Sequence, residues 1–586
     1  MIVLGYSGLD GSVAYALEDP GLRPGEERMV QGLDSAAALL VDGRVVAAAA
    51  EERFSFEKHT GAFPRLAIGY CLGQAGLRAA DIDLVAHGFD YGRYGALFAE
   101  DRFRRIFDPA RQPELWQDRL GVSLASTRFR PVSHHLAHAA SAWHPSGFDE
   151  ALCVVCDGMG EVESLSVFAA RDGKLERLDQ FGIRDSLGIL YGLVTVHLGF
   201  TFNADEYKVM GLAPYGNPDR FRPFFQSIVE LQAEGRYALR LDRLTTDRSP
   251  HWRGVLDHLA QHVLPRPEGA DTLPQVHCDF AAAAQECLER VLFHVLGYWR
   301  RRTGLRRLCM AGGVALNCTF NGKLIHSGLF DRVYVQPAAG DDGTALGAAL
   351  HAAYQAGERL SPANCGELPF YGPAYSDAAM AEAARTLGAG LTVTDLGSVE
   401  AAADDAAQAL HRGAIVAWFQ GRMEYGPRAL GSRSILANPL EPDIKERLNA
   451  VVKLREAFRP FAPAVAVERA SQYFDFVPSA TFDTMLATCL VRAPWRARLP
   501  GVTHVDGSAR MQTVDPGRNP LFHRLITAFG VLSGVHCVVN TSFNLRGQPM
   551  IVSPEVAIDT FRRVRLDRLY LGRLRLTKDE PAKDVP

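Results

Sequence analysis

Short apolar runs alternate with helix-like stretches along this chain, and several of the runs end in loops rich in glycine and aspartate. Residues 151–156 are apolar and precede an Asp-Gly-Met-Gly loop at 157–160. A short apolar run bounded by turn residues predicts a buried strand, and residues 308–310 and 333–335 follow the same pattern. Strands that alternate with helices and end in small-residue loops predict an α/β core with its ligand site at the strand ends.

The N-terminal region holds an apolar run at residues 2–5 and two more, 35–41 and 44–50, which an Asp-Gly pair separates. An Asp-Gly pair between two apolar runs strongly favours a β-hairpin with a tight turn. Residues 21–29 are rich in proline, glycine and charge, and they predict a loop before the hairpin.

Alanine-rich, helix-like stretches are interrupted by prolines and a glycine between residues 356 and 373. This change in composition predicts a domain boundary. We place it so that residues 1–360 form a first domain and residues 361–586 form a second α/β domain of ordinary size.

Composition narrows the class of protein. The 586 residues carry 63 Lys and Arg against 67 Asp and Glu, a net charge of −4, so there is no basic field and we expect no nucleic-acid partner. A basic leader and a run approaching ~20 apolar residues are both absent from the sequence, so we expect a cytoplasmic protein that does not bind membranes. The ten cysteines are scattered through apolar runs and predict core positions, not disulfides. A homodimer is the default expectation for a soluble enzyme.

His134 and His138 lie four residues apart in an alanine-rich segment. On a helix, both imidazoles would leave the same face about one turn apart, which suits one metal ion. Helical facing favours His134 over His135, although a spacing of three is also tolerated. Asp157 would add a carboxylate from the strand end. The alternative is an ordinary helix with core histidines, and the neighbouring glycine-rich loop weakens it.

Cations beside glycines and prolines recur in the second domain, where they predict a site for a small anion. Arg428 and Arg433 lie five residues apart around a Gly-Pro turn and offer guanidinium forks to phosphate or carboxylate oxygens. The whole set is Arg428, Arg433, Lys453, Arg459, Asn540 and Ser542. A surface residue or a structural ion pair is the alternative for each arginine, but their repeated placement at strand-to-loop junctions favours a binding site.

Eight motifs are each weak alone and highly specific together. They are residues 51–54, 134–141, 157–160, 208–213, 312–317, 426–434, 459–463 and 540–547. Through them, nearly the whole chain resembles the O-carbamoyltransferases of antibiotic and nodulation-factor biosynthesis. The resemblance implies an actin-like ATPase (ribonuclease H-like) domain with two lobes, followed by an α/β domain similar to the enzyme that makes threonylcarbamoyl-adenylate.

The resemblance also implies an activity with two sites. The C-terminal domain would bind carbamoyl phosphate and, with ATP and its Mg²⁺, form carbamoyl-adenylate. The residues implied there are Arg428, Arg433, Lys453, Arg459, Arg510, Asn540 and Ser542. A small-molecule hydroxyl of a secondary metabolite would then take the carbamoyl group in the N-terminal domain. The metal ligands implied there are His134, His138, Asp157 and Asp341. Loop alignment with the family favours Asp341 over Asp342. The residues implied in the nucleotide loops are Gly158, Gly160, Gly312, Gly313 and Asn317. Iron is the family's metal, and the ligand types leave manganese and zinc open.

Two further residues receive catalytic roles from the resemblance. Lys58 matches a position near the nucleotide and the acceptor, with a surface lysine as the alternative. Asp34 matches the second residue of a family His-Asp pair, but Leu33 stands here in place of the histidine. Asp34 must then act alone or another group must substitute, and the loop at 9–32 would belong to a different acceptor pocket.

Three other functions compete with this interpretation. A threonylcarbamoyl-transfer system acting on tRNA is disfavoured by the lack of excess positive charge. A hydrogenase-maturation carbamoyltransferase would carry CxxC zinc-finger pairs, which this sequence lacks. A non-catalytic nucleotide switch of the actin or chaperone kind would leave the arginine-rich site and the histidine pair unused.

Overall fold

The computed structural model describes residues 1–19, 21–23, 25–94, 106–246, 252–269, 273–366, 368–450, 456 and 458–579. The chain forms two compact units. The first unit contains Met1–Glu51, His59–Phe320 and Ser327–Gly366, and the second contains Glu52–Lys58, Asn321–His326 and Glu367–Pro586. The main division therefore follows Gly366, and two short segments of the predicted first domain belong to the second unit, which the sequence pattern did not predict.

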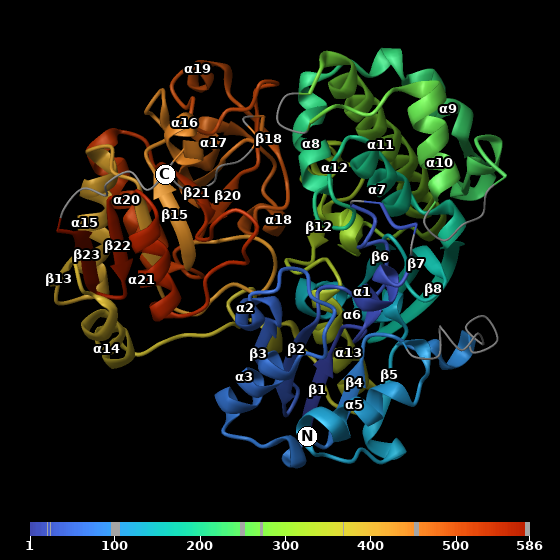
Figure 1. Cartoon of the computed structure of the whole chain (residues 1–586), viewed down its shortest axis with the longest axis horizontal. Helices are drawn as coiled ribbons and strands as arrows, with labels where there is room; N and C mark the ends of the chain where they lie inside the picture. The colour runs from blue at the N-terminus through green and yellow to red at the C-terminus, as the bar shows by residue number, and fades with distance from the viewer. Residues whose placement is uncertain are drawn as a thin grey trace. The chain divides into compact units, whose positions relative to one another are not determined.

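The first unit is built from two five-stranded sheets (Figure 1). One contains β1 (Ile2–Tyr6), β2 (Ala36–Val41), β3 (Arg44–Ala50), β4 (Leu84–His87) and β5 (Phe129–Pro131), in the order β3-β2-β1-β4-β5. The other contains β6 (Ala151–Cys156), β7 (Glu163–Arg171), β8 (Lys174–Gly182), β11 (Arg307–Ala311) and β12 (Arg332–Val335), in the order β12-β11-β6-β7-β8. The predicted strands and the hairpin of β2 and β3 are confirmed.

The two sheets share one topology. In each, the first three strands form an antiparallel meander, and the last two run parallel to the first strand. This duplication is the two-lobed ribonuclease H-like arrangement that the resemblance implied, so the predicted fold class is confirmed. In both sheets, the loops after the parallel strands emerge at one edge, where ligand sites of α/β folds are found.

Helices α6 (His134–Ser146) and α13 (Asp342–Gln355) lie side by side in the first unit (Figure 1). Their contact is close because Gly347 has no side chain: a Cβ added there would lie 1.8 Å from the Ala137 carbonyl oxygen of α6. The remaining helices of eight or more residues described in this unit are α3 (Arg65–Ala75), α5 (Arg111–Leu120), α7 (Leu187–His197) and α11 (Gln275–Thr303).

Replacing Gly347 with alanine should force α13 away from α6 and lower the free energy of unfolding by about 1–3 kcal/mol, as overpacking of a core does. Thermal unfolding followed by circular dichroism measures the change. The matched control is Gly73→Ala on the exposed face of α3, where no atom lies within 4 Å of an added Cβ. That control should stabilise the protein slightly, because alanine favours helix. Equal effects of the two variants would contradict the packing argument.

The second unit is organised around an eight-stranded mixed sheet in the order β13-β23-β22-β14-β15-β21-β16-β20. Its strands are β13 (Leu391–Asp395), β14 (Val416–Phe419), β15 (Arg433–Ala437), β16 (Ala462–Ala466), β20 (Gln512–Val514), β21 (Cys537–Ser542), β22 (Arg568–Leu571) and β23 (Leu574–Lys578). Helices α15 (Val399–His411) and α20 (Pro520–Ser533) pack together and bury their apolar faces with this sheet in one core. Among the described residues, no helix combines the length and apolarity needed to cross a membrane.

Candidate functional site

The two predicted histidines lie on one face of α6, one turn apart. The helix begins at His134, and the Nε2 atoms of His134 and His138 are 3.1 Å apart. Both side chains are fully buried. The helical facing predicted from their spacing is confirmed, and His135 points elsewhere, with its Nδ1 2.8 Å from the Ser166 hydroxyl.

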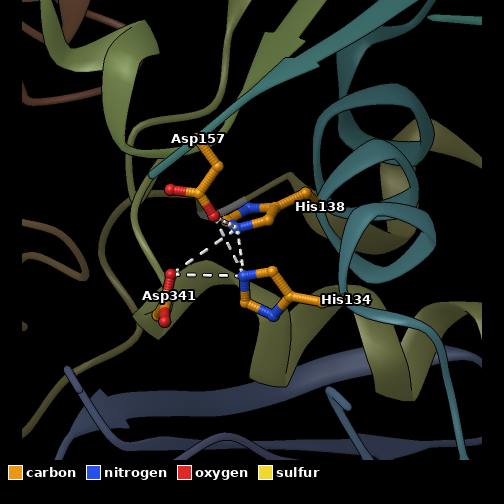
Figure 2. A group of neighbouring side chains, drawn as sticks. All are labelled: His134, His138, Asp157 and Asp341. Carbon is orange, nitrogen blue, oxygen red and sulfur yellow. Dashed lines mark hydrogen bonds and ion pairs between the residues drawn. The ribbon is translucent and has the colours of Figure 1, made fainter. Parts of the chain in front are cut away.

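Two aspartates complete a cluster with these imidazoles (Figure 2). Asp157 follows β6, and its Oδ2 lies 3.1 Å from His134 Nε2 and 3.4 Å from His138 Nε2. Asp341 precedes α13, and its Oδ1 lies 3.3 Å and 3.7 Å from the same two atoms. Metal bonds of about 2.0–2.2 Å place neighbouring ligand atoms about 3 Å apart, so the four side chains fit one ion. The cluster contains Asp341, and the neighbouring Asp342 accepts the Gly343 amide instead.

Hydrogen bonds behind the cluster orient its ligands. His134 Nδ1 donates to the Gly88 carbonyl at 3.1 Å, which turns the lone pair of Nε2 toward the cluster. Asp157 Oδ1 accepts the amides of Gly158 and Gly313 at 2.7 Å and 3.3 Å, so its other oxygen faces the histidines. The donor set is therefore held in place before any ion binds.

The charges of the cluster favour a cation. Burial opposes charge on His134, but Asp341 and Asp157 outweigh it and raise the pKa of this histidine well above its ordinary value. Burial likewise opposes charge on Asp157, yet hydrogen bonds from His134 and His138 hold the pKa of its carboxyl well below the usual range. A metal ion would take the place of the proton that His134 otherwise holds between the two carboxylates. Imidazole and carboxylate ligands suit iron, manganese or zinc.

Glu161 is a buried residue of this site that the sequence did not single out. Its Oε1 accepts the His134 amide at 2.9 Å and the Asp90 amide at 2.6 Å, and it therefore fixes the N-terminus of α6. Burial raises the pKa of its carboxyl to about 7. Its place directly after the glycine-rich loop is the one signal by which it could have been noticed.

The predicted glycine loops meet at the cluster. Gly312 adopts φ 90°, and an added Cβ would lie 2.3 Å from the Cys156 carbonyl, so only glycine lets the loop after β11 approach the end of β6. Gly160 accepts a hydrogen bond from the Gln31 side chain at 2.6 Å. The Asn317 amide exchanges hydrogen bonds with Gln285 of α11, so these contacts support the loop and a nucleotide role for Asn317 stays a prediction.

The two residues predicted to be catalytic lie in different units. Asp34 belongs to the first unit, where His59 Nδ1 lies 2.7 Å from its Oδ1. Lys58 is half-buried and belongs to the short segment of the second unit, so its predicted place beside the nucleotide of the first unit stays a prediction. His59 was not among the predicted site residues, although it directly follows Lys58.

In the second unit, most of the predicted anion-binding residues lie at one edge of the eight-stranded sheet. Strand β21 runs antiparallel to β15 and β16, and β20 runs parallel to β16, so the starts of these three strands meet the end of β21. The residues at those positions are Arg428 before β15, Arg459 before β16, Arg510 before β20, and Asn540 and Ser542 at the end of β21. Lys453 lies outside the described residues.

Arg433 corrects one prediction. Its side chain is fully buried, and its guanidinium donates to the carbonyl oxygens of Gln420 and Pro373, each at 2.8 Å, and to others nearby. It also lies 3.7 Å from the centre of the Phe419 ring. These contacts engage both terminal nitrogens in the fold, so Arg433 supports the loop and is not available as an anion ligand.

Buried polar groups shape the loop that carries Arg428. Glu424 Oε1 accepts the amides of Leu430 and Ser432 at 2.7 Å and 2.8 Å, which curls the loop around the carboxylate. Asn540 Nδ2 donates to the Ala429 carbonyl at 3.1 Å, next to Arg428. No role for Glu424 was predicted from the sequence.

Known proteins resemble this chain over most of its length. A family model described as the carbamoyltransferase N-terminus matches residues 30–92 and 121–350, and one described as the carbamoyltransferase C-terminus matches residues 407–578. Nodulation protein NolNO of Sinorhizobium fredii is 39% identical over 93% of this chain and 79% of its own length. Nodulation protein NolO of Bradyrhizobium diazoefficiens is 41% identical over 77% of this chain and 79% of its own length.

Solved structures are more distant. Component A of the (R)-2-hydroxyglutaryl-CoA dehydratase of Acidaminococcus fermentans is 16% identical, with a TM-score of 0.33 over 61% of this chain and 99% of its own. HypF of T. kodakarensis is 16% identical, with a TM-score of 0.31 over 61% of this chain and 48% of its own. The two family models and the relatives of about 40% identity decide the assignment: the chain belongs to the carbamoyltransferase family.

Proposed function

We propose that this carbamoyltransferase is an ATP-dependent O-carbamoyltransferase that forms carbamoyl-adenylate in its second unit and transfers the carbamoyl group to a hydroxyl in its first. Membership of the family supports carbamoyl transfer itself. The two reaction steps are assigned to different units because each unit holds a different kind of site. One has convergent metal ligands beside glycine loops, and the other has arginines at a sheet edge.

The second unit suits the activation step because it brings several arginines to one edge of its sheet. Guanidinium groups such as those of Arg428, Arg459 and Arg510 bind phosphate oxygens with two parallel hydrogen bonds. Carbamoyl phosphate, ATP and water would give carbamoyl-adenylate, phosphate and pyrophosphate. The product carries AMP, a good leaving group, on the carbamoyl carbon.

The first unit suits the transfer step. The ligands would be His134, His138, Asp157 and Asp341, and a divalent iron, manganese or zinc ion held by them would supply Lewis-acid polarisation and neutralise phosphate charge. The loops that carry Gly158 and Gly313 meet at the cluster, where Asp157 Oδ1 accepts both amides, and would bring their glycine backbone close to the phosphate oxygens. The acceptor, a hydroxyl of a small secondary metabolite, would attack the carbamoyl carbon and release AMP.

The deciding experiment incubates purified protein with ATP, Mg²⁺, carbamoyl phosphate and Fe(II) without oxygen. Radiolabelled pyrophosphate should enter ATP only when carbamoyl phosphate is present. A panel of sugars and other polyhydroxylated metabolites is then screened for acceptor-dependent release of AMP. Absence of any turnover that depends on carbamoyl phosphate would refute the proposal and favour a nucleotide switch. Transfer to tRNA in place of a small acceptor would favour the threonylcarbamoyl alternative.

A further inference from the structure

Asp34 and His59 form a hydrogen-bonded pair at the rim of the first unit's site. His59 Nδ1 lies 2.7 Å from Asp34 Oδ1, and the two side chains are 23% and 26% exposed for His59 and Asp34 respectively. The pair is thus held within the fold, and His59 Nε2 is itself buried, so an acceptor would contact it only when bound in the site. A carboxylate that accepts from Nδ1 selects the ring tautomer whose basic atom is Nε2.

Both residues of the pair have an unusual backbone. Asp34 adopts φ 53° and His59 φ 57°, in the left-handed region that residues other than glycine seldom occupy. The two loops hold each other in place, because the Ser35 amide donates to the Thr60 carbonyl at 2.9 Å. Strained backbone of this kind costs about 1–3 kcal/mol per residue and is found at functional sites. Holding the pair in this conformation therefore lowers the stability of the fold.

The pair lies at the same sheet edge as the metal cluster. Asp34 precedes β2, whose start is paired with the end of β1, and β1 ends beside β4. Gly88, directly after β4, holds His134 through its carbonyl. Gln31, three residues before Asp34, donates to the Gly160 carbonyl of the glycine loop. Three residues of chain span at most about 11 Å, so Asp34 lies close to that loop.

Leu33, the residue before Asp34, cannot supply an imidazole. Its side chain is 1% exposed and belongs to the core, and it provides no imidazole beside Asp34. The imidazole that contacts Asp34 instead comes from His59, nine residues after the end of β3. Two residues 25 positions apart in the sequence thus form one hydrogen-bonded pair.

We infer that Asp34 and His59 act as the base that accepts the proton of the acceptor hydroxyl. The inference rests on the proposed function. In this step the hydroxyl oxygen forms a bond with the carbamoyl carbon of carbamoyl-adenylate, and the bond from that carbon to the phosphate oxygen of AMP breaks. The hydroxyl proton passes to His59 Nε2, and AMP leaves. Asp34 stabilises the resulting imidazolium through Nδ1.

Glu206 reinforces this role. It lies at the start of α8 (Glu206–Leu212), and its carboxyl accepts the Asn203 amide at 2.7 Å. Burial raises the pKa of this carboxyl to about 7, while the positive charge of a protonated His59 lowers it. Charge on His59 and charge on Glu206 therefore favour each other, in addition to the contact of His59 with Asp34.

The test compares two nucleophiles in His59→Gln. One is the alcohol of the panel that wild-type protein carbamoylates fastest, and the other is hydroxylamine, whose neutral nitrogen attacks without first losing a proton. Carbamoylation of the alcohol should fall by about 100-fold or more, the usual contribution of a general base, while formation of hydroxyurea should change little. Asp34→Asn should act in the same direction. His523→Gln, which alters a half-buried histidine paired with Glu468 in the second unit, is the matched control and should change neither rate.

Equal losses with both nucleophiles would assign the pair a structural role, and an unchanged rate with the alcohol would remove it from the reaction; either result overturns the inference. Failure of the proposed function is distinct, because wild-type protein would then carbamoylate neither nucleophile. In that case nitrogen NMR of ¹⁵N-histidine protein, assigned with His59→Gln, still decides. The inference expects a proton on Nδ1 of His59 that depends on Asp34, and a proton on Nε2 alone would refute it.

Discussion

Replacing His134 with alanine should stop carbamoyl transfer while exchange of pyrophosphate into ATP continues. The change removes one of four ligands and leaves the carboxylates of Asp157 and Asp341 side by side with less positive charge to balance them. Lewis-acid stabilisation is worth several kcal/mol, so transfer should fall by about 1000-fold or more. Removing the transition metal from the wild-type protein with a chelator and then adding Mg²⁺ alone should likewise stop carbamoyl transfer while exchange continues.

Metal content, exchange of pyrophosphate into ATP and carbamoyl transfer are measured separately to test this prediction. Elemental analysis should find less than one equivalent of transition metal in His134→Ala and one in wild-type protein. His523→Ala, which changes a half-buried histidine of the second unit, should keep both the metal and the transfer activity. Loss of exchange and transfer together, in a variant that remains folded by circular dichroism, would show that the two steps do not divide between the two sites.

Replacing Arg428 with alanine should have the opposite effect and abolish the exchange of pyrophosphate into ATP that depends on carbamoyl phosphate. Arg428 lies at the sheet edge beside the Asn540 contact to Ala429. Hydrogen bonds to charged groups contribute about 1.5–3 kcal/mol each, so loss of a two-bond fork corresponds to about 100-fold or more. Arg428→Lys keeps the positive charge but not the two-bond geometry, so its exchange rate should lie between those of the wild-type protein and Arg428→Ala.

The control for this change is Arg385→Ala, which removes an exposed arginine of the same unit that pairs with Glu382 and should leave exchange unaltered. Arg428→Ala should also keep the transition metal of the first unit. Retention of full exchange activity in Arg428→Ala would move the carbamoyl phosphate site away from this sheet edge. Loss of metal in the same variant would point to general unfolding and not to a lost ligand.

Local patterns in the sequence were enough to predict the strands and helices named above and part of the metal cluster. The Asp-Gly pair between two apolar runs predicted the hairpin of β2 and β3, because turn chemistry acts over a few residues. The spacing of His134 and His138 predicted their shared face, because the helical repeat fixes it. The position of Asp157 followed from an apolar run that ends in glycines.

Long-range contacts decided the rest. Arg428 and Arg433 look alike in the sequence, but carbonyl groups of distant segments, including Pro373, engage Arg433 and leave it a structural role. The contact between His59 and Asp34 and the capping of α6 by Glu161 join residues 25 and 27 positions apart. Propensity and periodicity report only on neighbours along the chain. Which buried polar groups satisfy one another depends on packing between segments, and that becomes visible only when the chain is folded.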